Sequence, residues 1–226
     1  MSAIAAGFSD TIHDSQYCFR HLLTAMSQPG TLVELNLAQG FGSMMPASTQ
    51  VLLALADNST PVWLSNQFAN DIAVKENLNF HLGCSILSSQ KNGVQLSGIQ
   101  QKPSFGVISQ QDLVNFDWSQ TSFFVGCEEY PDRSTTVIVE VAGLSTVPCS
   151  LPETDADSPV VLRLSGPGIE HEARVVVQSL SSTVISVMLS QRKTHKFPLG
   201  LDFILVSGEK VVALPRSTTV EVMPCM

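Results

Sequence analysis

The amino-acid sequence predicts an α/β protein with three layers, in which a mixed sheet is flanked by helices. Helical and strand-like segments alternate through the first 142 residues, as in sheets that helices cover on both faces. Beyond an acidic stretch, strand-like segments dominate and short turns join them in pairs. We therefore expect a single α/β domain over residues 1–226, with the proline-bounded acidic loop at residues 152–159 as its one possible seam.

The N-terminal elements are predicted from periodicity and from their stop signals. Residues 14–28 place apolar side chains on one helical face, and Pro29-Gly30 ends the helix. Residues 31–37 alternate as a strand does. Residues 46–57 form a strongly apolar segment with a proline at its first turn, which predicts a buried helix.

The middle of the chain continues the alternation of helices and strands. A short strand is expected at residues 61–64, followed by a helix at 67–80. A strand at 105–108 and a short helix at 112–118 come next, and residues 135–142 have the apolar, β-branched composition of a buried strand.

The C-terminal third reads as two hairpins, one helix and a last strand. Residues 160–164 and 170–177 flank a Ser-Gly-Pro-Gly turn, and residues 203–206 and 211–214 flank a Ser-Gly-Glu-Lys turn. Helical periodicity covers residues 180–192, and the final strand is expected at residues 218–222.

Composition limits the classes of partner. Of the 226 residues 44% are hydrophobic and 14% are charged, so we expect partner subunits to cover part of the surface. The net charge of -8 argues against nucleic-acid binding, which requires a basic surface. The apolar runs are far shorter than the roughly 20 residues of a membrane helix. The N-terminus has no basic residue before an apolar run, so we expect a cytoplasmic protein.

Familiar catalytic and metal-binding motifs are missing from the sequence. It contains no Walker A loop, no G-x-G-x-x-G, no H-E-x-x-H and no G-x-S-x-G. Its five histidines lack ligand spacing, so no metal site is expected. Its five cysteines are scattered without a C-x-x-C pair, so free thiols are expected. Catalytic residues therefore remain unassigned.

The pentapeptide Arg-Ser-Thr-Thr-Val occurs twice, beginning at Arg133 and at Arg216. Each copy places a guanidinium beside hydroxyl groups such as that of Thr218, a set that suits a phosphate-like or carboxylate oxyanion. The alternative is a turn that leads into a Thr/Val-rich strand. Both interpretations stay open for each copy.

Two further residues are candidates for a ligand site or an interface. Arg20 lies between Phe19 and an apolar pair on the first helix, where it would reach a pocket, a partner's carboxylate or a surface ion pair. Asp202 lies at the start of an expected strand, where an acid caps an element, pairs with arginine or binds a substrate hydroxyl.

Four motifs in order resemble one known family. They are FRHLLTAMSQPG at residues 19–30, LALADNSTPVW at 53–63, LRLSGPGI at 162–169, and FPLGLD at 197–202 leading to LPRSTTVEV at 214–222. Together they resemble the H subunit of the bacterial carbon-phosphorus lyase system for phosphonate degradation, the PhnH family. The resemblance runs from about residue 13 to residue 222, and within it the copy at Arg216 belongs to a motif typical of the family.

The resemblance implies a fold similar to the large domain of pyridoxal-phosphate-dependent transferases, used without that cofactor. The six lysines agree with this, since none lies in a clearly enclosed context. It also implies a cytoplasmic homodimer that assembles with the G, I and J subunits, with K and L associated. No cofactor is expected, and no iron-sulfur cysteine cluster is present in the sequence.

The function implied by the resemblance is to support the transfer of a phosphonate onto the ribose of ATP with release of adenine. The chain is expected to be inactive alone. The alternative is a purely structural dimeric scaffold that holds the catalytic subunits. A third hypothesis, an independent pyridoxal-type enzyme, requires a covalently bound cofactor.

Overall fold

The computed structural model describes residues 4–88, 102–116, 118, 123–146 and 159–223, without the side chains of residues 191–193. Its helices are α1 (Thr11–Ser27), α2 (Pro46–Leu55), α3 (Asn66–Asn70), α4 (Ile72–Leu82) and α5 (Ser182–Thr194), with 3-10 turns η1 (Leu113–Asn115) and η3 (Pro131–Arg133). Most of the expected acidic seam, residues 152–158, lies outside the described residues.

Seven strands form a mixed sheet in the order β1-β10-β9-β5-β4-β2-β3. They are β1 (Leu32–Glu34), β2 (Val62–Leu64), β3 (Ile86–Ser88), β4 (Phe105–Ile108), β5 (Thr136–Glu140), β9 (Asp202–Ser207) and β10 (Lys210–Leu214). The strands from β9 to β3 are parallel, whereas β10 is antiparallel to both of its neighbours. The predicted mixed sheet with flanking helices is confirmed.

Four strands form a second, antiparallel sheet in the order β11-β7-β8-β6. They are β6 (Gly143–Ser145), β7 (Val160–Ser165), β8 (Ala173–Gln178) and β11 (Thr219–Met223). The hairpin formed by β7 and β8 agrees with the expectation from the sequence. The last strand, β11, pairs with this hairpin and not with the seven-stranded sheet. The sequence did not predict this pairing, because it depends on contacts between residues distant in the chain.

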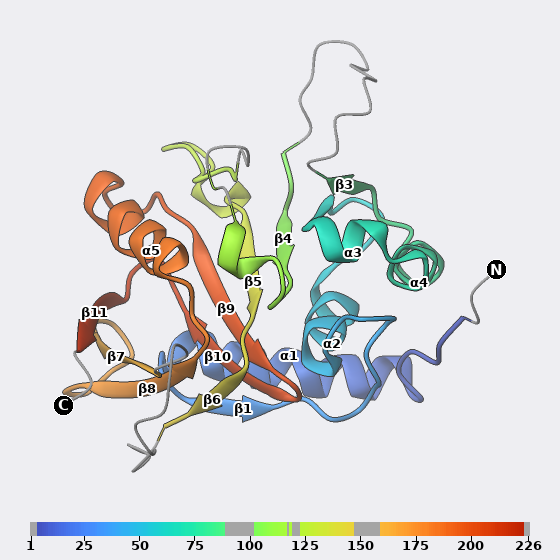
Figure 1. Ribbon diagram of the computed structural model, residues 1–226, viewed down its shortest axis with the longest axis horizontal. Coiled ribbons are helices and arrows are strands. Elements are labelled where there is room, and N and C mark those ends of the chain that lie inside the picture. The colour runs from blue at the N-terminus through green and yellow to red at the C-terminus, as the bar shows by residue number, and fades with distance from the viewer. Residues whose placement is uncertain (1–3, 89–101, 117, 119–122, 147–158, 224–226) are drawn as a thin grey trace.

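Two hydrophobic cores lie on opposite faces of the seven-stranded sheet. Helices α1 to α4 cover one face, where Ile138 and Ile204 belong to the same core cluster as the helical side chains of Leu22, Leu52 and Leu78. On the other face, the four-stranded sheet and α5 cover the remaining strand residues. Figure 1 shows α5, β7, β8 and β11 on one side of β9 and β10, and α2, α3 and α4 on the other.

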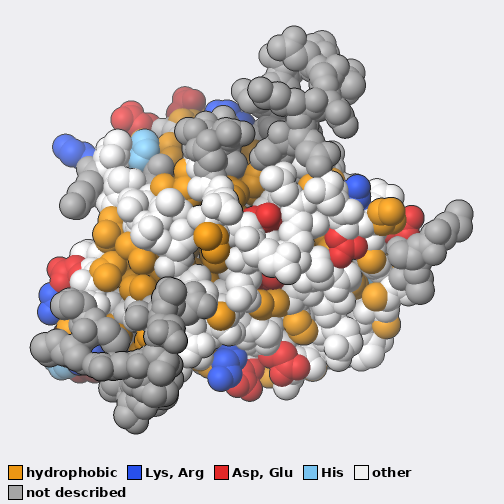
Figure 2. All heavy atoms as spheres, viewed as in Figure 1, with side chains coloured by type: hydrophobic (Ala, Val, Ile, Leu, Met, Phe, Trp, Pro, Cys, Tyr) orange, Lys and Arg blue, Asp and Glu red, His pale blue; other side chains and the backbone are white. Residues whose placement is uncertain are grey.

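The alternation of side chains along each strand explains why both faces are apolar. In β5, Val137 and Val139 point into the core under the four-stranded sheet, and Ile138 points toward the helices. On the face drawn in Figure 2, hydrophobic side chains form several small groups between polar atoms. The strands are therefore buried on both sides, as expected of a largely parallel sheet.

Some expected elements are wrong in extent. The helix expected at residues 67–80 is two helices, because Asp71 has an extended backbone and its carboxylate caps α4 by accepting from the N–H of Ala73 at 2.8 Å. Where a short helix was expected at 112–118, the described residues include a 3-10 turn at Leu113–Asn115 and none of them is α-helical, while residue 117 lies outside the described residues. The short strands β3 and β6 were not predicted.

Candidate functional site

Arg216 forms a dense hydrogen-bonded cluster in the link between β10 and β11. Its Nε donates to both carboxylate oxygens of Asp202, at 3.1 and 3.2 Å, and its Nη2 donates to the same carboxylate. Its Nη1 donates to the carbonyl oxygens of Pro131 at 2.7 Å and Pro198 at 3.2 Å. Its Nη2 also donates to the hydroxyl of Ser134. These bonds use all five N–H groups that an arginine side chain carries.

The ion pair between Arg216 and Asp202 is largely buried, with side-chain exposures of 15% and 11%. The backbone N–H of Arg216 also donates to Asp202, at 2.7 Å. Charge-assisted bonds of this kind are stronger than neutral ones, and removing one partner leaves a buried charge uncompensated. We call Arg216, Asp202 and Ser134 the Arg216 clasp.

The clasp joins the two copies of the repeated pentapeptide. Ser134 belongs to the first copy, and Arg216 begins the second. Thr135 of the first copy is buried, and its hydroxyl donates to the carbonyl oxygen of Pro103 at 2.7 Å and accepts from the N–H of Phe124 at 3.0 Å. Thr218 of the second copy is also buried, and its N–H donates to the Pro215 carbonyl at 2.9 Å. Thr135 and Thr218, the first threonine of each copy, are therefore buried, whereas Thr219 of the second copy is exposed.

Arg133 and Arg20 lie apart from the clasp as exposed side chains. The guanidinium of Arg133 stacks over the ring of Tyr130, with its carbon 4.3 Å from the ring centroid. Arg20 is exposed on α1, and its Nη2 donates to Gln16 at 3.4 Å. Among the five candidates, the fold thus joins Arg216 to Asp202, and Thr218 follows Arg216 by two residues in the chain. Arg20 and Arg133 remain on the surface.

The clasp lies at the amino ends of the parallel strands. Asp202 begins β9 and lies opposite Thr136, which begins β5. Open α/β sheets bind ligands at the carboxyl ends of their strands, which is the other edge. A shallow hollow of about 310 Å³ opens beside the clasp, and its lining includes Phe197, Pro198 and Pro215.

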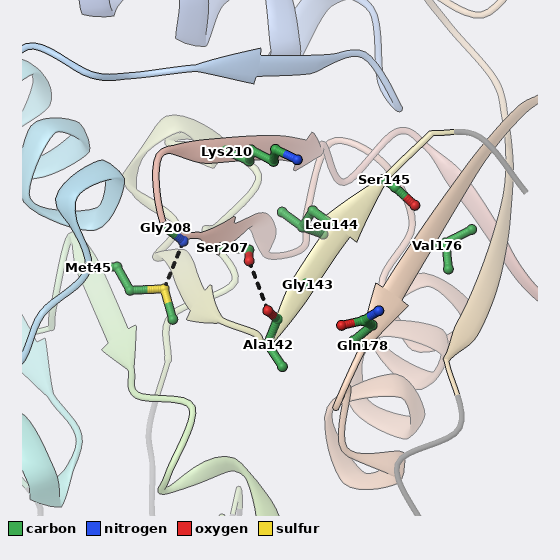
Figure 3. Close-up of a pocket in the computed structure, with 10 residues that line it drawn as sticks. All are labelled: Met45, Ala142, Gly143, Leu144, Ser145, Val176, Gln178, Ser207, Gly208 and Lys210. Atoms are coloured by element: carbon green, nitrogen blue, oxygen red, sulfur yellow. Dashed lines mark hydrogen bonds between the residues drawn. The ribbon is translucent and has the colours of Figure 1, made fainter. Parts of the chain in front are cut away.

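A second pocket, of about 460 Å³, lies at the carboxyl ends of β5 and β9. Figure 3 shows its lining, to which β6, β8, the turn after β9 and the start of α2 all contribute. Met45 lies on one side, where its sulfur accepts from the N–H of Gly208 at 3.2 Å, and Ser207 donates to the carbonyl oxygen of Ala142 at 3.2 Å. Lys210 is the charged side chain among its ten lining residues.

Glu140, at the end of β5, is a functional candidate that sequence reasoning missed. Its side chain is buried, with 2% of the residue exposed, and its carboxylate accepts from the N–H of Met45 at 2.7 Å. Burial raises the pKa of Glu140 to about 7. One signal was available, since a glutamate ending a run of four apolar or β-branched strand residues is placed where a fold must bury it.

The described residues offer no metal centre, because no three His, Cys, Asp or Glu side chains in that part of the chain gather closely enough. Cys18 and Cys84 are buried free thiols and Cys127 is exposed, while Cys149 and Cys225 lie outside the described residues. None of the helices in the described ranges is both long and apolar enough to cross a membrane.

Comparison with known proteins gives the family. The model of the bacterial phosphonate metabolism protein family (PhnH) matches residues 6–221. The chain belongs to the PhnH family. The predicted resemblance is thereby confirmed, and with it a role in phosphonate catabolism. The clasp residues and both pockets lie within the matched range.

Two curated relatives agree with the PhnH assignment. The chain is 30% identical over 219 residues to the α-D-ribose 1-methylphosphonate 5-triphosphate synthase subunit PhnH of Rhizobium meliloti, which covers 96% of this chain and 95% of the relative. It is also 30% identical over 203 residues to the putative C-P lyase subunit protein HtxG of Stutzerimonas stutzeri, covering 90% and 84%. Both relatives are named as subunits.

Proposed function

We propose that this chain is the H-type subunit of a bacterial α-D-ribose 1-methylphosphonate 5-triphosphate synthase and that it acts in the cytoplasm within a carbon-phosphorus lyase assembly. The observation that carries this proposal is the alignment over nearly the whole length of both chains with a relative of that name. A match to one motif or one domain would not carry it, because a fold alone hosts many functions.

In the proposed reaction, a phosphonate oxygen attacks C1′ of the ribose of ATP and the bond from C1′ to N9 of adenine breaks. The phosphonate oxygen loses its negative charge in the new bond, and the departing adenine takes up a proton. The chain assists this transfer without supplying the whole active site. This view is supported by Arg216 and Asp202, whose N–H donors and carboxylate are already hydrogen-bonded within the fold.

A purely structural dimeric scaffold is the second candidate function. The same bonds of Arg216 favour it, since a guanidinium used wholly inside the chain stabilises a loop and does not bind a ligand. Under both candidates the chain forms a homodimer and assembles with the G, I and J subunits, with K and L associated. We propose that Arg216, Asp202 and Thr218 shape the surface for such a partner, and that Arg20 and Arg133 face it directly.

We infer that the fold is related to the large domain of pyridoxal-phosphate-dependent transferases and that the chain binds no pyridoxal phosphate. A lysine that holds this cofactor is enclosed, whereas the lysine side chains of the described residues, Lys75, Lys102, Lys196 and Lys210, are exposed or half-buried. The independent pyridoxal enzyme therefore finds no support among them.

The experiment is to incubate ATP and methylphosphonate with the purified chain, with the remaining subunits, and with the complete mixture, and to measure free adenine by chromatography. We expect adenine from the complete mixture alone, because the chain completes an assembly that neither part forms by itself. Adenine release by the isolated chain would falsify its dependence on partners. Full release by the remaining subunits without it would remove this chain from the reaction.

A further inference from the structure

A pocket without an assigned role lies at the carboxyl ends of β5 and β9. Its volume is about 460 Å³, within the range of roughly 300–1,000 Å³ that is typical of small-molecule sites. Its lining includes Ala142, two residues after β5, and Ser207, the last residue of β9. Open α/β sheets bind ligands at this edge, whereas the Arg216 clasp lies at the other edge. The pocket is therefore better placed than the hollow beside the clasp to hold a small molecule.

Apolar side chains form much of the lining of this pocket. Figure 3 shows Met45 on one side and Val176 and Gln178 on the other. The sulfur of Met45 accepts from the N–H of Gly208 at 3.2 Å, and this bond holds the thioether beside the pocket. Leu144 adds a further apolar side chain to the lining. Thioethers make favourable contacts with aromatic rings, so this lining suits a flat ring.

The side-chain amide of Gln178 is the polar group that can orient a ligand in the pocket. Among the described residues it has no hydrogen-bond partner, and the residue is half-buried. A Cβ at Gly143 would lie 2.5 Å from Oε1 of Gln178. The backbone of Gly143 does not have a positive φ, so the glycine here provides the room that the amide occupies. An amide presents a donor and an acceptor side by side.

The charges next to the pocket give no preference for an anionic ligand. The charged side chain of the lining, Lys210, lies opposite Glu34 in the ladder of β1 and β10, and it directly follows Glu209. Both glutamates are exposed, and residues directly opposite each other in antiparallel strands have neighbouring side chains. Glu140 is not among the lining residues, and its carboxylate accepts from the N–H of Met45. The carboxylates around Lys210 therefore offset its charge.

We propose that this pocket binds a neutral purine base, namely adenine, whose edge pairs with the amide of Gln178 while its ring packs against Met45. The inference rests on the proposed function, in which adenine is the neutral product. An amide pairs with adenine by accepting from its amino group and donating to the adjacent ring nitrogen. ATP would bring three phosphate groups, for which the lining offers no arginine. The pocket thus holds the base after its release.

The test titrates the purified full-length chain with adenine by isothermal titration calorimetry. We expect Gln178→Leu to weaken adenine binding by about ten-fold or more, because leucine removes both hydrogen-bonding groups at similar size. Purine, which lacks the amino group, should bind the wild-type chain about ten-fold more weakly than adenine does. In Gln178→Leu the two bases should bind about equally, because the group that distinguishes them is gone.

Two controls separate the pocket from general effects. Gln111 is exposed and lies outside the lining, so Gln111→Leu makes the same change elsewhere and should bind adenine within about two-fold of the wild-type chain. ATP should bind about ten-fold more weakly than adenine, since the lining provides no phosphate site. Circular dichroism and thermal unfolding of each variant establish that it is folded.

Each outcome decides between the alternatives. If adenine does not bind the wild-type chain, or binds Gln178→Leu equally well, the pocket is not an adenine site, and adenine release by the complete mixture still decides the proposed function. If ATP binds as tightly as adenine, the pocket takes a nucleotide and the neutral base is wrong. If Gln178 discriminates adenine from purine but the complete mixture releases no adenine, the binding site stands and the proposed function falls.

Discussion

At the scale of single residues, Glu140 and Arg216 show two ways in which this chain accommodates a buried ionisable side chain. Arg216 is paired with Asp202 and bonded to three further acceptors. Glu140 has no cation among its described bonds and accepts from the N–H of Met45, so burial raises its pKa to about 7. A lone buried carboxyl with a raised pKa contributes to stability only while it is protonated.

We predict that Glu140 makes stability fall as pH rises. The unfolded chain loses this proton near pH 4.5, while the folded chain keeps it up to about pH 7. The contribution of Glu140 is therefore fully present below pH 4.5 and is lost as the pH rises through 7. In Glu140→Gln this titration is absent. Between about pH 5 and pH 8 the free energy of unfolding of the wild type should fall by roughly 2–3 kcal/mol relative to the variant.

Urea denaturation of both proteins across this pH range measures the difference. Gln keeps an oxygen that accepts from Met45, so the comparison isolates the ionisation. Parallel pH profiles for the wild type and the variant would show that Glu140 ionises as freely in the folded chain as in the unfolded one.

At the scale of elements, the turn between β7 and β8 also packs against the end of α1. Gly168 has a φ of +84°, and a Cβ there would lie 1.9 Å from the carbonyl oxygen of Ser27 at the end of α1. Gly30 has a φ of +90°, and a Cβ there would lie 2.7 Å from the Cβ of Ala173 and 3.1 Å from a methyl group of Leu164. The end of α1 thus packs against the four-stranded sheet so closely that only glycine fits at these two positions.

We predict that Gly168→Ala destabilises the protein far more than Gly208→Ala does. Gly208 has a φ of +62°, but a methyl group at this position would have nothing within 4 Å, so its alanine variant bears only backbone strain of about 1 kcal/mol. Gly168→Ala adds a clash with backbone and should cost roughly 3 kcal/mol or more. Thermal unfolding of the two variants measures this, and equal losses would mean that α1 moves away from the turn without cost.

The individual elements could be predicted from the sequence, whereas their pairing and the clasp could not. Residues 105–108 match β4, because a buried strand carries a local apolar signal. The prediction of one helix over residues 67–80 was wrong, because Asp71 ends one helix and caps the next without a glycine or proline to signal the break. Arg216 was a candidate by its motif, but its contact with Ser134 joins residues far apart in the chain. No local pattern encodes such a contact.

At the scale of the whole molecule, the Arg216 clasp connects parts that no single element holds together. Asp202 begins β9, Ser134 precedes β5, and Arg216 lies where the chain passes from the seven-stranded sheet to the four-stranded sheet. Pro131 and Pro198 add two loops. The clasp therefore fixes the position of β11 relative to the larger sheet.

We predict that Arg216→Ala lowers the free energy of unfolding by about 3–5 kcal/mol, because it leaves the carboxylate of Asp202 buried without its cation. Arg133→Ala is the matched control from the other copy of the repeat. It removes one exposed stacking contact and should cost less than about 1 kcal/mol. Chemical denaturation of both variants provides the comparison. Similar small losses would show that Arg216 is free to serve a ligand and does not hold the fold.

The pairing of β1 with β10 sets the order in which this protein is completed. Leu32 lies opposite Val212, so a strand near the start of the chain is held by one near its end. While the chain is being synthesised on the ribosome, β1 lacks its neighbouring strand until β10, at residues 210–214, has emerged. Contacts so distant in sequence slow folding. The larger sheet therefore closes only after β10 has been synthesised, and a chain terminated before residue 210 would expose the apolar residues that β10 covers.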